Sequence, residues 1–421
     1  MTMSNVVDSL TSTDVDAFAD SDNDAVVDAS HSALHLANHD EVEGDTNIKP
    51  NSRNLRREQT WLTIIYLSLF SVVGSSLRIF MGRFFGGDCD LNVEGGQIDD
   101  FLWSSSHKIC ITTSGKTEQY GGALFVDLPA NMLGSFIMGY NIGHSVDWPA
   151  IPCLAYNHPL QFEKGLQIGI TTGFCGSLTT LSSWNSQMVM MMNGNANPYL
   201  GSQVPAALFG YILGLQTSLV SFRAGRALAV FVHAKRNPYI FNHDLCKKGV
   251  RRKWYHDHQY WITPMILLII SGTLIAVYAA GDMLWGIPYY RQVWIACILA
   301  PLGSILRWKL SLWNGKFSFP LGTFVANFAA CVISSAITSL VIVKSEDDLP
   351  DGWMIPTMQA ISLGFTGCLS TVSTFARECV EIGERNPPDS KIQFLYSHGT
   401  LLICCITGYF VYSLTAINKT N

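Results

Sequence analysis

Apolar stretches of about 20 residues, the length needed to cross a bilayer as a helix, recur along most of this chain. Of its 421 residues, 48% are hydrophobic and only 14% are charged, whereas about a quarter of the residues in a soluble protein are charged. The sequence therefore predicts an all-α polytopic membrane protein. A P-loop and a nucleophile paired with a base are both missing from the apolar stretches, which argues against an enzyme.

Nine segments are expected to span the membrane. They are residues 61–81, 121–141, 165–192, 204–224, 261–280, 290–309, 319–343, 355–379 and 394–416. The second and third are diluted by Gly, Asn, Ser and Thr. Residues 1–58 are rich in Asp, Ser and Asn and are expected to form a disordered cytoplasmic tail.

The basic blocks predict how these segments are oriented. RNLRR (53–57), RAGRA (223–227) and KKGVRRK (247–253) should be cytoplasmic, because positive charge is enriched on that side. The N-terminus is then cytoplasmic, and nine crossings leave the C-terminus extracellular. Loop 82–120 falls outside, where Cys89 and Cys110 could pair. Asn418 begins a glycosylation sequon, and the remaining cysteines are expected to be small buried hydrophobes.

Three motifs occur twice in the same order. GSSLRIF (74–80) matches GSILRWK (303–309), LPANMLGSF (128–136) matches FVANFAACV (324–332), and GFCGSLTTLSSW (173–184) matches GFTGCLSTVSTF (364–375). This predicts a duplicated four-span unit, at residues 59–227 and 290–416. Residues 228–289 would hold a basic linker and one extra span, which inverts the second unit. Inverted repeats are common in transporters, with the site between them.

The third motif places glycines and hydroxyls in the middle of a span. Backbone groups freed from a helix in lipid must be satisfied by protein or water, so Gly176 and Thr179, with their counterparts Gly367 and Ser370, should face the interior. Two such breaks could aim oxygens at a small monovalent cation. The alternative is that small residues simply let helices pack closely.

Other repeated side chains have a functional and a structural interpretation. Asn131 and Asn327 could donate to a passing anion or bond to another helix. Arg78 and Arg307 could form a positive vestibule or anchor span ends. The edges of Trp184 and Phe375 could contact an anion, although such rings usually only pack.

Acidic residues are missing from the repeated motifs. Asp127, near the mouth of the second span, and Glu378, at the end of the eighth, come closest. A proton-coupled pump would be expected to carry such a group within a span. The histidines of HDLCKK and WYHDHQYW lie in the basic linker, where metal binding is not expected. The basic blocks are explained by topology and indicate no nucleic-acid partner.

The three motifs, in this order, resemble those of the fluoride channel family, which comprises the bacterial Fluc (CrcB) channels and their fused two-domain fungal counterparts. The resemblance covers about residues 60–415, and GFCGSLTTLSS is close to the family's GFCGGLTTFSTF. It implies two antiparallel four-span units, two fluoride pores and a central structural sodium ion. A fused chain would supply both units itself and act as a monomer.

The resemblance also implies roles for individual residues. Fluoride contacts are implied for Asn131, Asn327, Phe375, Trp184, Tyr396, Thr400, Thr180, Ser373 and Thr374, a vestibule for Arg78 and Arg307, and sodium-binding backbone oxygens at Gly176, Thr179, Gly367 and Ser370.

Departures from the family pattern predict unequal pores. Leu181 and Val372 replace two of four expected phenylalanines. Thr400 follows Tyr396 by four residues, whereas Leu215 follows Tyr211, with Thr217 and Ser218 nearby. One working pore is therefore expected.

The resemblance thus implies a passive channel that exports fluoride across the plasma membrane. Two alternatives stay open: a sodium- or proton-coupled transporter of another small solute, and a membrane scaffold that transports nothing.

Overall fold

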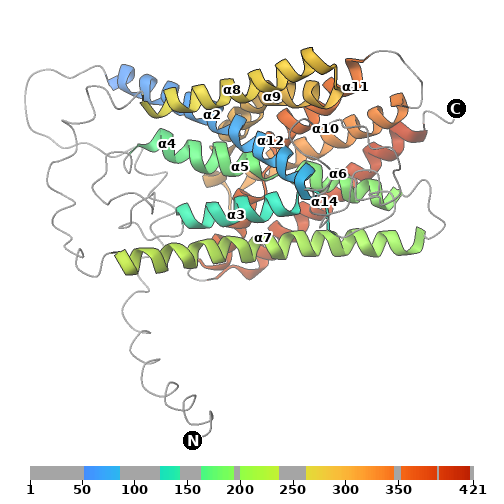
Figure 1. Ribbon diagram of the computed structural model, residues 1–421. Coiled ribbons are helices and arrows are strands. Elements are labelled where there is room, and N and C mark those ends of the chain that lie inside the picture. The colour runs from blue at the N-terminus through green and yellow to red at the C-terminus, as the bar shows by residue number, and fades with distance from the viewer. Residues whose placement is uncertain are drawn as a thin grey trace, which may run out of the picture.

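The computed structural model describes residues 52–85, 124–142, 163–193, 200–236, 262–345, 352–385 and 388–417. Within these ranges the regular structure is entirely helical. Most helices run along one common direction, with the short α5 and α12 near the centre of the bundle (Figure 1). The chain is an all-helical, polytopic membrane protein.

The helices follow the same order in the two halves of the chain. The first half contains α2 (Ser52–Phe85), α3 (Leu128–Ile142), α4 (Lys164–Ile168), η5 (Gly169–Cys175), α5 (Gly176–Leu178), α6 (Leu181–Asn193) and α7 (Leu200–Arg236). After α8 (Ile262–Trp285), the second half contains α9 (Pro288–Ser311), the 3-10 turn η7 (Asn314–Lys316), α10 (Leu321–Ser345), α11 (Met354–Ala360), η8 (Ile361–Thr366), α12 (Gly367–Leu369), α13 (Ser373–Gly383) and α14 (Ser390–Ile417).

Six of the described helices are long and apolar enough to cross a membrane. They contain Gln59–Phe85, Gln203–Val232, Thr263–Trp285, Pro288–Lys316, Leu321–Val343 and Ser390–Leu414. The other three predicted spans also contain helix, but α3 has only 15 residues, and the remaining two are interrupted. Each interrupted segment passes from α-helix through a π-helical stretch, η5 or η8, into a three-residue α-helix before helix stops.

Two helices extend beyond the predicted spans. Helix α2 already begins at Ser52, inside the expected tail. Helix α7 continues to Arg236 and has 37 residues, about 55 Å at 1.5 Å per residue, so RAGRA is helical. Good helix formers on both sides of these boundaries let the helices run beyond their apolar parts. Cys89, Cys110, Asn418 and the KKGVRRK block lie outside the described residues.

Glycines allow the first helix of each half to lie directly on the π-helical stretch. A Cβ atom on Gly74 of α2 would collide with the carbonyl oxygen of Phe174, and one on Gly303 of α9 would collide with that of Phe365. These glycines open the GSSLR and GSILR motifs, so the repeated glycine is explained by the same close approach in both halves. The seven described cysteines are all free and buried, as expected.

Helix α8 packs on α2 and α9 and is fixed at its C-terminal end by a polar cluster. Asp282 accepts two hydrogen bonds from Arg291 at 3.0 and 3.1 Å and one from Trp294 Nε1 at 3.1 Å. Arg291 also donates to the carbonyl of Gly352 and lies 4.0 Å from the ring centroid of Trp353. The end of α8, the start of α9 and the start of α11 therefore lie at the same end of the bundle.

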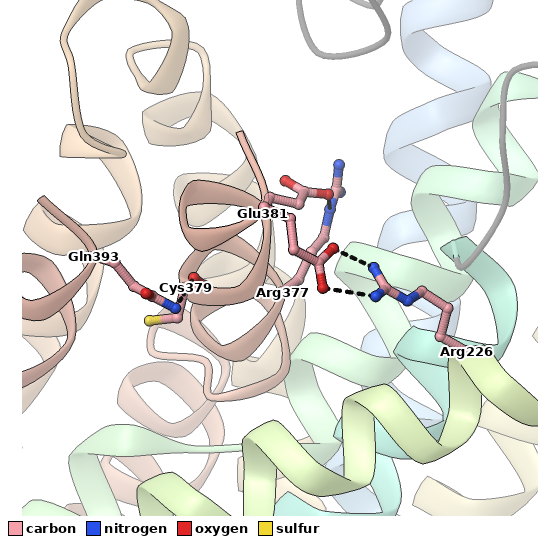
Figure 2. A network of polar contacts seen from close by, with 6 residues as sticks. Arg226, Arg377, Cys379, Glu381 and Gln393 are labelled. Atoms are coloured by element: carbon pink, nitrogen blue, oxygen red, sulfur yellow. Dashed lines mark hydrogen bonds and ion pairs between the residues drawn. The ribbon is translucent and has the colours of Figure 1, made fainter. Parts of the chain in front are cut away.

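A second polar cluster joins the two halves between the C-terminal third of α7 and the end of α13 (Figure 2). Arg226 of α7 forms a bidentate ion pair with Glu384, which follows α13, at 2.6 and 2.7 Å. Next to it, Arg377 pairs with Glu381 at 2.5 Å. Both side chains of the first pair are more than a third exposed, so the pair contributes little net energy but fixes which helix ends are neighbours.

Candidate functional site

The two interrupted helices meet where their helical segments stop. Thr179 and Thr180 separate α5 from α6, and residues 370–372 separate α12 from α13. The Oγ1 atom of Thr179 lies 3.2 Å from that of Thr371, and Thr180 Oγ1 lies 3.1 Å from Ser370 Oγ. All four side chains are buried. The glycine- and hydroxyl-rich motifs thus form two turns that lie against each other.

Each interrupted helix is capped by a hydroxyl from the other one. The backbone N–H of Ser182, in the first turn of α6, donates to Ser370 Oγ at 3.1 Å. In the same way the N–H of Ser373, in the first turn of α13, donates to Thr179 Oγ1 at 3.1 Å. The first N–H groups of a helix need such acceptors. The two helix starts therefore depend on each other, and matched residues make matched bonds.

Asn131 and Asn327 hold the two breaks in place. Asn131 Nδ2 donates to the carbonyl of Thr180 at 3.2 Å, and Thr180 N donates to Asn131 Oδ1 at 2.8 Å. Asn327 exchanges the same two bonds with Thr371, at 3.1 and 2.7 Å. Each amide replaces backbone bonds that are lost at the break. An amide nitrogen carries two hydrogens, so one N–H of each asparagine is not used in these bonds.

Arg78 and Arg307 reach across to the interrupted helix of the opposite half. Arg78 Nη2 donates to the carbonyl of Leu363, and Arg307 Nη2 donates to that of Thr172. Arg78 Nε also donates to Ser177 O at 3.0 Å. The two side chains are only 1% and 3% exposed.

The sequence placed these arginines near span ends, as a positive vestibule or as anchors, and the structure buries both side chains between the two halves. Both were assigned to span ends from local hydropathy, but backbone carbonyls of the interrupted helices, freed from regular helical bonding, accept their N–H groups in the interior. A guanidinium group can be buried where enough acceptors surround it. The arginines thus link the two halves by donating to backbone carbonyls of the interrupted helices.

The oxygen atoms implied for a sodium ion are partly occupied by protein. Arg307 Nη1 donates to the carbonyl of Gly176 at 2.8 Å and to that of Ser370 at 2.7 Å. A carbonyl that accepts an N–H from a cationic group is a poor ligand for a second cation. In this arrangement the oxygen set at Gly176, Thr179, Gly367 and Ser370 does not fit a bound sodium ion, and Arg307 supplies positive charge at two of these positions.

Trp184 and Phe375 occupy equivalent places beyond the two breaks, with different surroundings. The indole of Trp184 stacks on Phe125, with ring centroids 5.0 Å apart, and lies 5.7 Å from Tyr211. Phe375 meets Tyr396 edge to face at 5.2 Å. Both side chains are fully buried. The rings pack against aromatic partners in both halves, as the structural interpretation predicts.

The two tyrosines on the last helix of each half bond to different partners. Tyr396 OH donates to Glu378 Oε2 at 2.6 Å, whereas Tyr211 OH donates to Asn185 Oδ1 at 2.7 Å. Thr400 Oγ1 donates to the carbonyl of Tyr396 one turn earlier, and Ser218 Oγ to that of Gly214. The structure therefore distinguishes the halves at this level, in agreement with the sequence departures.

The other hydroxyls and branched residues named from the sequence have different surroundings. Thr374 N donates to Thr371 Oγ1 at 3.4 Å, and Thr217 bonds only to carbonyls of its own helix. Leu181 and Val372, which replace phenylalanines, are buried in the same apolar cluster as Trp184 and Phe375.

A buried carboxylate organises polar side chains beside the helix that follows each break. In the first half Asp127 Oδ2 accepts from Ser183 Oγ at 2.5 Å and from Gln187 Nε2 at 3.0 Å. In the second half Glu378 Oε1 accepts from Thr323 Oγ1 at 2.7 Å and from Asn314 Nδ2 at 2.9 Å.

These two clusters use equivalent positions with exchanged roles. Asp127 and Thr323 each stand four residues before the motif asparagine, and Gln187 and Glu378 each stand three residues after the motif aromatic. The carboxylate thus stands before the motif asparagine in the first half and after the motif aromatic in the second half. Sequence analysis noted both acids but missed the exchange. Ser183, Gln187, Thr323 and Asn314 were missed as partners, although a comparison of the flanks of the repeated motifs could have found them.

The family comparison matches this chain in two segments. The model described as "CrcB-like protein, Camphor Resistance (CrcB)" matches residues 65–215 and residues 294–411. Each segment contains one copy of the three motifs and one interrupted helix. No solved structure was found to match the chain.

Curated relatives carry fluoride-related names. Fluoride export protein 1 of Candida albicans is 28% identical over 292 residues, which cover 66% of this chain and 68% of that protein. Fluoride export protein 1 of Neurospora crassa is 26% identical over 239 residues, 52% of this chain but only 43% of that protein. Fluoride-specific ion channel FluC 1 of Staphylococcus aureus (strain bovine RF122) is 35% identical over 109 residues, 26% of this chain and 76% of that protein. With the two matched segments covering more than half of its residues, the chain belongs to the CrcB-like family.

Proposed function

We propose that this protein is a passive, fluoride-selective channel that exports cytoplasmic fluoride. The observation that carries the proposal is the crossing of two matched, hydroxyl-rich interrupted helices, one from each CrcB-like segment. Two relatives named fluoride export protein and one named fluoride-specific ion channel support the choice of ion. The chain's residues would bind and orient the ion through N–H and O–H donors.

The properties of fluoride explain why its pathway needs N–H and O–H donors. The ion is small and strongly hydrated, so a pathway must replace its water with hydrogen-bond donors. The described residues offer the buried hydroxyl of Thr180 and the second N–H of Asn131 and Asn327. Hydrogen fluoride enters cells as a neutral acid and dissociates inside. An inside-negative potential then favours exit of an anion by about 2.3 kcal/mol per 100 mV, so a passive channel suffices.

The two halves are proposed to lie in opposite orientations. Only residues 194–199 separate α6 from α7, so these helices run in opposite directions. Arg226, in the C-terminal third of α7, pairs with Glu384, which follows the end of α13. The end of α13 is then on the side opposite to the end of its counterpart α6. This supports an inverted repeat, with nine spans and α8 as the inverting one.

The proposed domains are the cytoplasmic tail 1–58, the repeats 59–227 and 290–416, and the linker 228–289. The polar clusters support the topology. Arg226 and Glu384 meet at the end assigned to the cytoplasm, while Arg291 and Gly352 meet at the end assigned to the outside. The plasma membrane is the proposed location, because export there removes the ion from the cell. A single chain holding both repeats supports a functional monomer.

One working pore is proposed, because the two sets of residues beyond the breaks differ. Tyr396 bonds to a carboxylate and Tyr211 to an amide. Leu215 stands where the second half has the hydroxyl of Thr400. The structural sodium ion implied by the resemblance is left out of the proposal, because Arg307 already occupies the carbonyls of Gly176 and Ser370.

The direct test is fluoride efflux from liposomes that contain the purified full-length protein, measured with a fluoride electrode. Fluoride should leave rapidly when a potassium ionophore balances charge, with no added sodium or proton gradient, and chloride-loaded liposomes should stay silent. Proportionate chloride efflux, absence of both fluxes, or a requirement for an imposed gradient would each reject a passive fluoride channel.

A further inference from the structure

The residue that follows the motif aromatic differs between the halves. Phe375 is followed by Ala376, but Trp184 is followed by Asn185, whose side chain is fully buried. Tyr211 OH donates to its Oδ1 atom at 2.7 Å. This bond fixes the amide so that Nδ2 points away from the tyrosine. The two N–H groups of Asn185 therefore face away from Tyr211.

Those N–H groups have no hydrogen-bond partner among the described residues. Asn185 Nδ2 and the hydroxyl of Ser335 are both buried and both unpaired, with exposed fractions of 0% and 1%. A buried donor without an acceptor is unfavourable because it has lost its hydrogen bonds to water, and native proteins leave few of them. Two next to each other indicate that something else accepts their hydrogens.

The two groups converge over a glycine. A Cβ atom on Gly408 of α14 would lie 2.7 Å from Asn185 Nδ2 and 2.9 Å from Ser335 Oγ. Helices α6, α10 and α14 thus each contribute one residue, and a side chain at position 408 would collide with both donors, so they lie against the bare backbone of Gly408. No carboxylate is bonded to either group among the described residues, so the donors favour an acceptor that is small and anionic.

The location continues the candidate pathway. Ser335 lies eight residues after Asn327 on α10, and Gly408 lies eight residues after Thr400 on α14. Residues spaced by multiples of four share one face of a helix over a few turns. Asn185 follows the break on α6. On its own helix, each of these three residues lies on the C-terminal side of the residue assigned to the candidate pathway.

We propose that Asn185, Ser335 and the bare backbone at Gly408 form a binding subsite for a small, strongly hydrated anion, fluoride, on the outward side of the crossing. This rests on the proposed function and on the proposed orientation. The subsite accepts the ion after it leaves the hydroxyls of the breaks, through the amide N–H of Asn185 and the hydroxyl of Ser335. The bond from Tyr211 keeps the amide oxygen turned away from the anion.

The test measures fluoride efflux from liposomes that contain full-length variants. Asn185→Asp keeps an acceptor for Tyr211 but replaces the N–H donor with a carboxylate oxygen. It should lower efflux by about tenfold or more, the size expected for losing a hydrogen bond to a charged group and adding repulsion. Gly408→Ala should act similarly, because its Cβ atom would collide with both donors. Gly399→Ala, on the same helix with nothing near its Cβ position, is the matched control and should conduct like the wild type.

Ser335→Ala separates an anion subsite from a packing role. Its hydroxyl bonds to nothing described, so its removal should leave the protein at least as resistant to heat, as judged by size-exclusion chromatography after heating. The proposal expects slower fluoride efflux nonetheless. Unchanged efflux in both Ser335→Ala and Asn185→Asp would overturn the subsite. Absence of flux in the wild type would instead overturn the proposed function.

Discussion

The hydroxyl oxygens of Thr179 and Thr371 lie 3.2 Å apart, although 192 residues separate the two threonines in the chain. Each belongs to the nonhelical part of a different interrupted helix, and each half caps the helix start of the other. The two CrcB-like segments therefore form one structural unit, in which neither break is complete alone.

Thr179→Val should destabilise the protein measurably. The hydroxyl accepts from the backbone N–H groups of Val372 and Ser373, both at 3.1 Å, and valine would leave them buried without an acceptor. The expected loss is about 1–3 kcal/mol per unpaired group. Denaturant unfolding of the purified protein in detergent measures it. Thr217→Val is the control, because Thr217 bonds only to carbonyls of its own helix; equal losses in both variants would contradict the capping role.

Asn327→Ala should lower both stability and fluoride efflux. Its amide exchanges two hydrogen bonds with Thr371, so its loss frees a buried N–H and a buried carbonyl at the break. Asn141→Ala is the matched control, since Asn141 donates a single bond to the carbonyl of Ile137. Thermal unfolding and liposome efflux are compared for the two. Asn327→Ala protein with wild-type stability but no efflux would show that the amide serves only the ion.

Arg307→Lys should be poorly tolerated. The guanidinium donates to the carbonyls of Thr172, Gly176 and Ser370, and a lysine ammonium cannot reach three acceptors with a planar fork of donors. We expect a loss of about 1–3 kcal/mol for each carbonyl left unpaired. Arg385→Lys, exposed and bonded once to Ser318, should change the unfolding midpoint little. Similar midpoints for both variants would argue against the role of Arg307.

The exchanged carboxylates predict a compensating pair of mutations. Asp127→Thr removes the acceptor for Ser183 and Gln187, and Gln187→Glu places a second carboxylate next to Asp127; each single change should reduce stability. The double variant reproduces the arrangement of Thr323 and Glu378 and should recover part of the loss. Unfolding midpoints of the two singles and the double give the coupling, which should be about 0.5–3 kcal/mol for groups in contact. Additive losses would contradict the exchange.

Cysteine labelling should find the two polar clusters on opposite faces of the membrane. Met283, at the end of α8, is 86% exposed, and Arg385, just beyond α13, is exposed as well. In intact cells, a membrane-impermeant maleimide should label Met283→Cys but label Arg385→Cys only after permeabilisation. Wild-type protein gives the background. Labelling of both without permeabilisation would contradict the proposed inversion.

Hydropathy and motif order predicted most of the helical layout. Helix is present in each of the nine predicted segments, and the interruptions fall at Thr179 and Ser370, within the motifs identified from sequence. These predictions succeeded because the length of an apolar stretch and a cluster of glycine and hydroxyl residues are both local features of the sequence. The π-helical stretches η5 and η8 were not predicted, since a shift in backbone hydrogen bonding has no distinctive residue pattern.

The missed contacts all join residues that are distant in sequence. Arg78 and Arg307 were placed near span ends, as a vestibule or as anchors, because nothing local reveals that carbonyls of the other half will accept hydrogen bonds from them. The same holds for Asn185 and Ser335, which come together with Gly408 only through packing of three helices. A single sequence can identify polar residues in apolar segments, but which ones meet depends on tertiary structure.

Asp127 and Glu378 bear on how the two repeats diverged after duplication. Each cluster holds one acidic residue, but the position that bears it differs between the repeats. A position-by-position superposition of the repeats therefore pairs an acid with a threonine and an acid with a glutamine, and recognises the common carboxylate only when each cluster is compared as a whole.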